Sequence, residues 1–120
     1  MHITVMTFYI YCLLFPNVDG IYIGATADPD KRYTHHCNAM MQNRHGNYRV
    51  QQAFNAYTEL PIIKIVEKFE ADCVDRICAK EEEWMQEEIY WWGREYLFNV
   101  ELTSNPEDFA VYHLPKCVEL

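Results

Sequence analysis

One carboxylate in this sequence stands where an amphipathic helix should bury apolar side chains. In the segment 72–92, a helical period of about 100° per residue places six apolar residues on one stripe: Val74, Ile77, Cys78, Trp84, Met85 and Trp92. Glu81 lies near the middle of this stripe, whereas Glu82 and Glu83 point away from it. A buried carboxylate is costly unless it is paired or bound to a metal ion. The pattern indicates either a metal ligand at Glu81 or a buried ion pair with an arginine or lysine.

A second candidate group combines a phosphate binder with a proton carrier. Arg32 and His36 are four residues apart in a segment with helical character, so they share a face, with His35 adjacent. A guanidinium can bind phosphate oxygens bidentately and neutralise the charge of a pentacovalent transition state. A nearby histidine can carry a proton near neutral pH. Alone, such a pair is more often a solvated helix face. Because adjacent helical residues diverge, His35, His36 and Cys37 do not predict a zinc site.

Tyr11 and Tyr22 are two further candidates. Each stands in a segment rich in β-branched and aromatic residues, which is typical of strands. Aromatic residues in strands usually serve only for packing. A free tyrosine has a pKa near 10, so it could act as a base only beside a cation or a proton relay.

The elements that must position these residues follow a readable order. Segments 5–14 and 21–26 are predicted strands, and the turn residues of 16–20 between them indicate a hairpin. Asp28 followed by Pro29 is typical of a helix N-terminus. The complete prediction is strand, strand, helix, helix, strand and helix, at residues 5–14, 21–26, 28–41, 48–57, 61–69 and 72–92, with Asp72 capping the last helix and Gly93 ending it.

The charge of the chain is unevenly distributed. A net charge of −8 on 120 residues, a length that has room for one domain, argues against a general nucleic-acid binder. Residues 1–66 nevertheless carry +1, so residues 67–120 carry −9. Any phosphate-binding face should be built from the first part, which also holds His2, His35, His36 and His45. On charge alone, an ordinary acidic protein is an equally good interpretation.

The cysteines and the N-terminus bear on the cellular compartment. The odd number of cysteines and their irregular spacing predict reduced thiols in the core rather than a disulfide framework, at Cys12, Cys37, Cys73, Cys78 and Cys117. The apolar run 10–15 follows no lysine or arginine and is too short to span a membrane. We therefore expect a soluble, cytoplasmic protein without a membrane partner, or a nuclear one in a eukaryotic host.

Taken together, these features resemble the GIY-YIG nuclease family. The two motifs that name the family match residues 9–11 and 22–24, and residues 31–36 resemble its Arg-aromatic-x-x-His pattern. Further similarity lies at Arg44 to Asn47, Val50-Gln51, Ala53-Phe54, Glu81 three residues before Trp84, and Phe98-Asn99-Val100. The resemblance covers residues 8–100. It departs from the family at Tyr9, where a glycine is usual, and the literal Gly20-Ile21-Tyr22 is a coincidence because it overlaps the second motif.

The resemblance implies a fold and a metal. The expected fold is a compact α/β (α+β) domain of β-β-α-α-β-α order, in which helices flank a three-stranded antiparallel sheet. We expect this domain to span residues 1–100, with residues 101–120 as an extension packed on it. Glu81 would hold one Mg²⁺ or Mn²⁺, since a hard ion can take one carboxylate, several waters and the substrate phosphate.

The resemblance also implies roles for the other candidates. Arg32 would neutralise the scissile phosphate, and Tyr11 is the better candidate for activating the attacking water, aided by Tyr22 or His36. Asn99 and His45 would position the phosphate or brace the site. The remaining contacts to the substrate backbone are expected from Lys31, Arg44 and Arg49.

The implied function is an endonuclease, with DNA favoured over RNA as substrate. The alternative is a non-catalytic module that keeps the fold and binds branched nucleic acid or a protein partner. The joint presence of the six matched polar residues favours the enzyme, whereas the acidic second half favours a binder or a regulated enzyme. No zinc finger or helix-turn-helix is evident, so specificity would come from local loops, a homo-oligomer or a protein partner.

Overall fold

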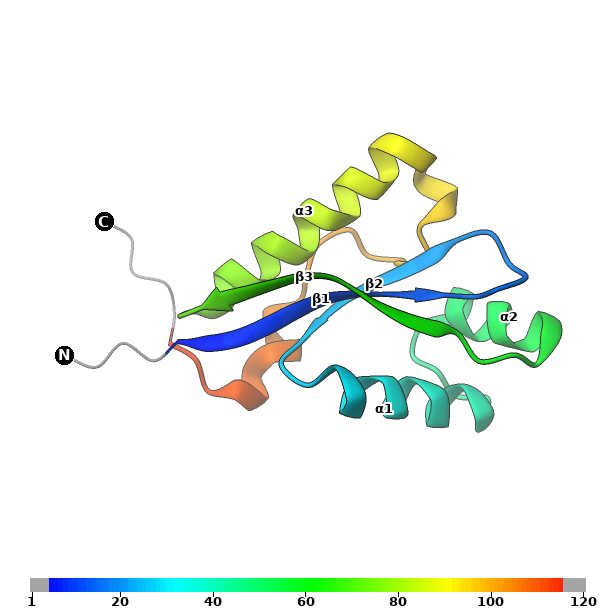
Figure 1. The fold of residues 1–120 in the computed structure, drawn as a ribbon, viewed down its shortest axis with the longest axis horizontal. Helices are drawn as coiled ribbons and strands as arrows, with labels where there is room; N and C mark the ends of the chain where they lie inside the picture. The colour runs from blue at the N-terminus through cyan, green and yellow to red at the C-terminus, as the bar shows by residue number, and fades with distance from the viewer. Residues whose placement is uncertain (1–4, 116–120) are drawn as a thin grey trace.

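The computed structural model describes residues 5–115 (Figure 1). Its main elements follow the predicted order: β1 (Met6–Leu14), β2 (Ile21–Thr26), α1 (Pro29–Met41), α2 (Tyr48–Tyr57), β3 (Ile62–Ala71) and α3 (Val74–Trp92). Two 3-10 helices come after them, η1 (Arg94–Tyr96) and η2 (Pro106–Tyr112). The predicted fold class is confirmed, although β3 begins one residue later than expected and ends two residues later.

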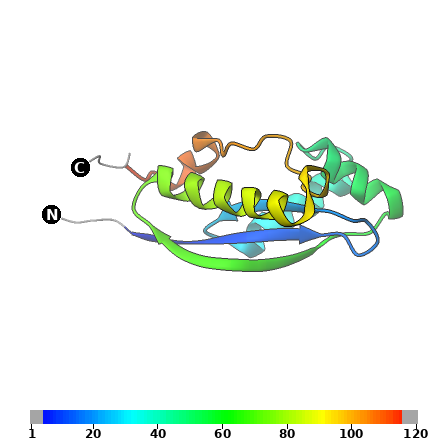
Figure 2. The ribbon, with the colours of Figure 1, turned by 90° about the horizontal axis from the view of Figure 1, so that it is seen from above.

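The three strands form one antiparallel sheet in the order β2-β1-β3, so β1 is central. Because side chains alternate across a strand, Phe8 and Ile10 join a core beneath α3, whereas Tyr11 and Leu13 join a second core with α1 and α2. Figure 1 shows α3 along one side of the sheet and α1 and α2 along the other, and Figure 2 shows α3 running alongside the strands. The sheet is therefore covered on both faces. The edge strand β2 borders a cleft at the place where the two helical layers meet.

The helix starts agree with the sequence prediction in two of three places. Asp28 caps α1, its carboxylate accepting a hydrogen bond from the Lys31 backbone N–H at 3.1 Å. Asn47 caps α2 in the same way. The prediction that Asp72 caps α3 is wrong, because Cys73 occupies the N-cap without a side-chain hydrogen bond. Asp72 instead pairs with Arg76 at 2.8 Å across one helical turn.

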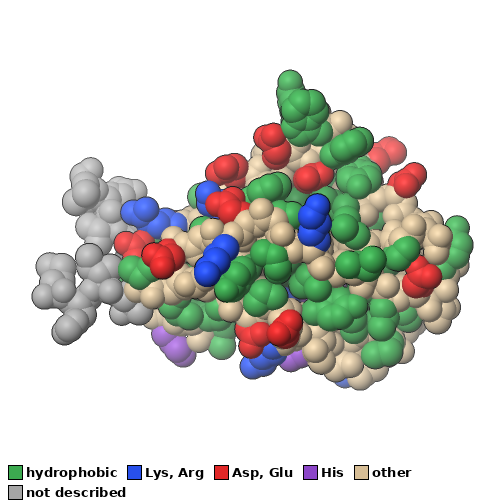
Figure 3. All heavy atoms as spheres, in the orientation of Figure 1, with side chains coloured by type: hydrophobic (Ala, Val, Ile, Leu, Met, Phe, Trp, Pro, Cys, Tyr) green, Lys and Arg blue, Asp and Glu red, His purple; other side chains and the backbone are tan. Residues whose placement is uncertain are grey.

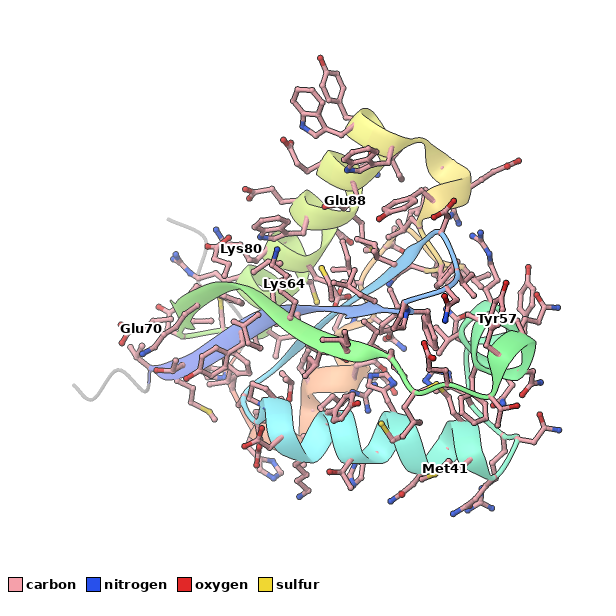
Figure 4. All side chains as sticks on the ribbon, turned by 45° about the vertical axis from the view of Figure 1, so that its right-hand side comes forward. Met41, Tyr57, Lys64, Glu70, Lys80 and Glu88 are labelled. Atoms are coloured by element: carbon pink, nitrogen blue, oxygen red, sulfur yellow. The ribbon has the colours of Figure 1, made fainter. Side chains whose placement is uncertain are left out.

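The C-terminal end of α3 is an exposed aromatic tip. Tyr90, Trp91 and Trp92 are 78%, 65% and 67% exposed, so the prediction that Trp92 faces the core is wrong. The apolar stripe predicted along the helix extends to Trp92, but the sheet does not reach this end of α3 (Figure 1). Figure 3 shows a group of hydrophobic side chains with carboxylates around it at the top of the molecule, where Figure 1 has the end of α3. In Figure 4, the labelled Lys64 and Lys80 lie on the side where α3 crosses β3.

The segment after residue 100, as far as the structure describes it, packs on the same body. Phe109 is 3% exposed and belongs to the core beneath α3. The Tyr112 hydroxyl accepts a hydrogen bond from the Ala27 backbone N–H at 3.1 Å. These contacts fix η2 against the junction of β2 and α1. Within residues 5–115, none of the helices combines the length and apolar character needed to cross a membrane.

The cysteines differ in state. Cys12, Cys37 and Cys78 are buried free thiols, as expected of core fillers. Cys73 is disulfide-bonded, so the expectation of reduced thiols throughout is wrong at this position. Cys117 and His2 lie outside the described residues.

Candidate active site

A cleft runs beside β2 and consists of two adjoining cavities of about 490 and 870 Å³. Both are lined by side chains from β2, α1, α3 and η2, namely Tyr22, Arg32, His35, Glu81 and Asp108. The smaller cavity also takes in Tyr11, Gly24 and Lys31. The larger cavity adds His36, His45, Asn99 and Ser104. The structure thus brings most of the predicted site residues to one place, although they are separated by up to 88 positions in the chain.

Tyr11 reaches the cleft across a glycine. Its partner in the β1–β2 register is Gly24, and a Cβ atom at position 24 would overlap the Tyr11 ring and hydroxyl. Although Tyr11 is only 1% exposed, its side chain lines the smaller cavity. The glycine that ends the second motif therefore has a steric role, since any side chain there would displace the tyrosine of the first motif.

A directional chain of hydrogen bonds ends on Tyr11. The backbone N–H of Asn47 donates to His45 Nδ1 at 3.0 Å, so the proton of neutral His45 lies on Nε2. His45 Nε2 then donates to His36 Nδ1 at 2.7 Å. The proton of neutral His36 is consequently on Nε2, which donates to the Tyr11 hydroxyl oxygen at 2.7 Å. One fixed backbone donor thus sets the tautomer of two histidines.

Burial keeps both histidines and Tyr11 in their neutral forms at neutral pH. Burial, reinforced by the charge of Arg32, lowers the pKa of His36 to about 3, and burial also lowers the pKa of His45. Arg32 Nε donates a second hydrogen bond to the Tyr11 oxygen at 3.3 Å. Burial raises the pKa of Tyr11, so at neutral pH it is a hydroxyl. The Tyr11 oxygen accepts hydrogen bonds from His36 and Arg32, and both would stabilise a phenolate. The hydroxyl proton of Tyr11 therefore points toward neither of these groups.

Glu81 enters the cleft from α3 as a half-buried carboxylate. Burial raises its pKa to about 7, with the negative charge of Asp108 acting in the same direction. Within residues 5–115 it has no ion-pair partner, so the alternative of a buried pair with arginine or lysine is not realised. The same residues hold no cluster of three or more side chains suited to bind a metal. A carboxylate that lines an open cavity and has no ion-pair partner among residues 5–115 fits a Mg²⁺ or Mn²⁺ ion that would retain several waters.

Glu82, which was expected only to point away from the apolar stripe, makes a structural contact. Its Oε1 accepts a hydrogen bond from the Ser104 backbone N–H at 2.8 Å and so holds the segment after α3 in place. Glu83 is exposed, in agreement with the prediction. The difference arises because the sequence pattern could not show where residues 101–115 return to the helix.

Asn99 acts as a brace. Its side-chain oxygen accepts from the Ile23 N–H and its amide nitrogen donates to the Ile23 carbonyl, each at 2.8 Å. Arg94 in turn donates to the Asn99 carbonyl at 2.7 Å. Asn99 was expected either to position the phosphate or to brace the site, and its hydrogen bonds in the structure brace the site. His45, whose ring bonds His36 and the Asn47 backbone, is engaged in the same way.

Arg49 is occupied by the protein itself. Its guanidinium donates to the carbonyls of Leu97 at 2.5 Å and Glu95 at 2.6 Å, and it lies over the Phe98 ring. The expected phosphate contact at Arg49 therefore has to be revised to a structural one. Lys31 is exposed and lines the smaller cavity, so it keeps the expected position. Arg44 is exposed in the loop between α1 and α2 and lines neither cavity.

Two solved structures are similar to this chain. They are the catalytic domain of homing endonuclease I-TevI and the same domain of intron endonuclease I-TevI carrying a glutamate-to-alanine substitution. Both align with a TM-score of 0.68 at 20% identity, covering 78% and 82% of this chain and 98% of their own. The chain has the GIY-YIG fold. No protein-family model matches the sequence, and no curated protein does either.

Within the GIY-YIG fold, the unusual Tyr9 is readily accommodated. It pairs with Thr26 of β2 and Lys68 of β3 in unbroken register and is half-buried. The ladder irregularity of the central strand falls later, between Ile10 and Tyr11. The departure from the family motif therefore leaves the face of β1 that carries Tyr11 intact.

Proposed function

We propose that this protein is a metal-dependent endonuclease that hydrolyses phosphodiester bonds in DNA. The observation that carries the proposal is the convergence of a donor-bound tyrosine, an arginine and an uncompensated carboxylate on one cleft, on Tyr11, Arg32 and Glu81. The similarity to endonuclease catalytic domains supports the same reaction class.

Each of the three steps in catalysis, namely phosphate binding, metal binding and water positioning, is assigned to a different residue of the cleft. Arg32 holds the scissile phosphate through the guanidinium nitrogens that do not bind Tyr11. Glu81 holds the divalent ion, which when bound stabilises negative charge on the leaving 3′ oxygen. Tyr22, beside His36 with ring centroids 5.4 Å apart, orients the attacking water.

Tyr11 is the proposed base. In its phenolate form the oxygen can accept from His36, from Arg32 and from the attacking water at once. The water oxygen then bonds to phosphorus as its proton passes to Tyr11, and the bond from phosphorus to the 3′ oxygen breaks. Because the histidine chain is fixed from Asn47, His36 remains a donor throughout and stabilises the charged oxygen.

The non-catalytic alternative rests on the acidic second half of the chain. A binder would need neither a carboxylate left unpaired at Glu81 nor a glycine that makes room for the Tyr11 hydroxyl. Specificity within the enzyme proposal would come from the loops around the cleft, from a homo-oligomer or from a protein partner.

A cleavage assay tests the proposal. The purified chain is incubated with supercoiled plasmid, single-stranded DNA and RNA, with Mg²⁺, with Mn²⁺ or with a chelator. We expect nicked or linear plasmid only when the ion is present, and little RNA cleavage. Tight DNA binding without cleavage under every ion condition would favour the non-catalytic alternative.

The salt dependence of DNA affinity should be shallow. With Arg49 occupied, about three cationic side chains remain to contact phosphates, namely Lys31, Arg32 and Arg44. We expect log K against log salt to fall with a slope of about −3, measured with Ca²⁺ replacing Mg²⁺ to prevent cleavage. Lys31→Ala should reduce this slope by about 1. Lys64→Ala, on the β3 side that lines neither cavity, is the matched control (Figure 4). A slope near −8 would contradict a small binding patch.

A further inference from the structure

The wall of the cleft opposite α1 is built by the segment that follows residue 100. Phe109 anchors this wall in the core, and Tyr112 ties it to the β2–α1 junction. The Ser104 backbone is held by Glu82 of α3. Between these anchors Asp108 lines both cavities, as Glu81 and Arg32 do. A second carboxylate, from an element outside the region of family resemblance, therefore faces the same space as the candidate metal ligand.

The space between the two carboxylates also meets a buried polar atom without a partner. Ser104 is 9% exposed and lines the larger cavity together with Glu81 and Asp108. Its hydroxyl oxygen completes no hydrogen bond within the described residues, although it lies near the Glu81 carboxylate and the Cys78 thiol. Buried hydroxyls are normally satisfied by protein or by an ordered water. An orphaned one beside two carboxylates points to a hydrated cation as the missing partner.

We propose that Asp108 is a second carboxylate ligand, direct or through one water, for the divalent cation held by Glu81. The proposal rests on the proposed function, because it assumes the ion at Glu81. Mg²⁺ is commonly held by one or two carboxylates together with waters and phosphate oxygens. Two carboxylates would balance the charge of the ion, leaving Arg32 to meet the phosphate. Ser104 would hydrogen-bond to a water of the ion's hydration shell.

Without a cation, this arrangement is unfavourable. Glu81 and Asp108 are both anionic when ionised and line the same two cavities, so their charges repel. Arg32 lines these cavities too, but it forms no ion pair with either carboxylate among residues 5–115. A cation between the two side chains would remove the repulsion.

The test measures Mn²⁺ binding to the full 120-residue chain without DNA, from the loss of the electron paramagnetic resonance signal of free Mn²⁺. Asp108→Asn should weaken Mn²⁺ binding by about 10- to 100-fold, the range found when groups supporting a metal site are removed. Glu107→Gln makes the same charge change one residue away, on an exposed side chain that lines neither cavity, and should stay within about twofold of wild type. Asp108 is exposed, so its variant should fold normally, as checked by thermal melting.

The outcomes separate this inference from the proposed function. If Glu81→Gln loses Mn²⁺ while Asp108→Asn binds it like wild type, Asp108 is not a ligand and only this inference fails. If Asp108→Asn keeps its Mn²⁺ affinity but binds DNA more tightly in chelator, the carboxylate merely repels substrate, which also overturns the inference. If the wild type binds no Mn²⁺, both the inference and the metal-dependent function fail together.

Discussion

Glu81→Gln is expected to abolish Mg²⁺-dependent cleavage while preserving the fold. The amide keeps the size of the side chain but removes the charge that holds the ion. Stabilisation of the transition state by a metal is worth several kcal/mol, so the single-turnover rate should fall by about a thousand-fold or more. Glu83→Gln is the control, because this neighbour on α3 is exposed. Glu82 is unsuitable for that purpose, since it holds the Ser104 backbone.

The same variant should be more stable than wild type in metal-free buffer, in a pH-dependent way. Burial raises the pKa of Glu81 from 4.5 to about 7, so the ionised side chain is less favourable in the folded protein than in the unfolded chain. This cost is absent below about pH 4.5 and complete above about pH 7. The melting temperature of Glu81→Gln should therefore exceed that of wild type at pH 8 and equal it at pH 4. Undiminished cleavage, or identical melting at both pH values, would refute this role of Glu81.

Tyr11→Phe is expected to lower the single-turnover cleavage rate by about 100-fold or more, the scale of general-base catalysis. The change removes one hydroxyl and almost no packing volume, so the sheet should fold as before. DNA affinity measured in Ca²⁺ should stay within a few-fold of wild type. Because burial raises the pKa of Tyr11, the active phenolate is the minor form, and the wild-type rate should rise with pH throughout the neutral and alkaline range. A wild-type profile that is flat above neutral pH would argue against Tyr11 as the base.

Tyr9→Phe is the matched comparison for this experiment. Tyr9 is on the same strand but lines neither cavity, so its hydroxyl should be dispensable. Near-normal rates in Tyr9→Phe, Tyr11→Phe and Tyr22→Phe alike would remove the case for tyrosine chemistry on this hairpin. A loss at Tyr9 alone would show that the first motif is set in the wrong register.

The elements and the core of the fold could be predicted because they depend on local periodicity. The β-branched and aromatic composition of β1 and the capping residue Asp28 are both encoded within a few positions of where they act. The same holds for Glu81, whose placement on an apolar stripe is a property of one helix. Such features need no knowledge of which elements meet.

The features that could not be predicted depend on long-range contacts. Arg49 was expected to contact phosphate, but its guanidinium is taken by carbonyls that lie 46 and 48 residues further along the chain. Asp108 gave no sequence signal, because a carboxylate in a short irregular segment becomes significant only when η2 is placed beside α3. The role of the glycine at position 24 does leave a sequence signal, because the residue that faces a tyrosine in a hairpin register is predictable once the turn is known.

The brace formed by Asn99 also determines how this sheet can meet other chains. The segment that carries Asn99 runs beside β2: Phe98 N–H donates to the Ile21 carbonyl at 2.7 Å, and Asn99 satisfies both backbone groups of Ile23. An extended peptide therefore finds no open row of donors and acceptors here and cannot lengthen the sheet beside the cleft. The opposite edge, β3, carries lysines and glutamates in its exposed half and a ladder irregularity, both of which discourage pairing between copies. Both edges of the three-stranded sheet are thereby protected against edge-to-edge aggregation, β2 by one asparagine side chain and β3 by charged side chains.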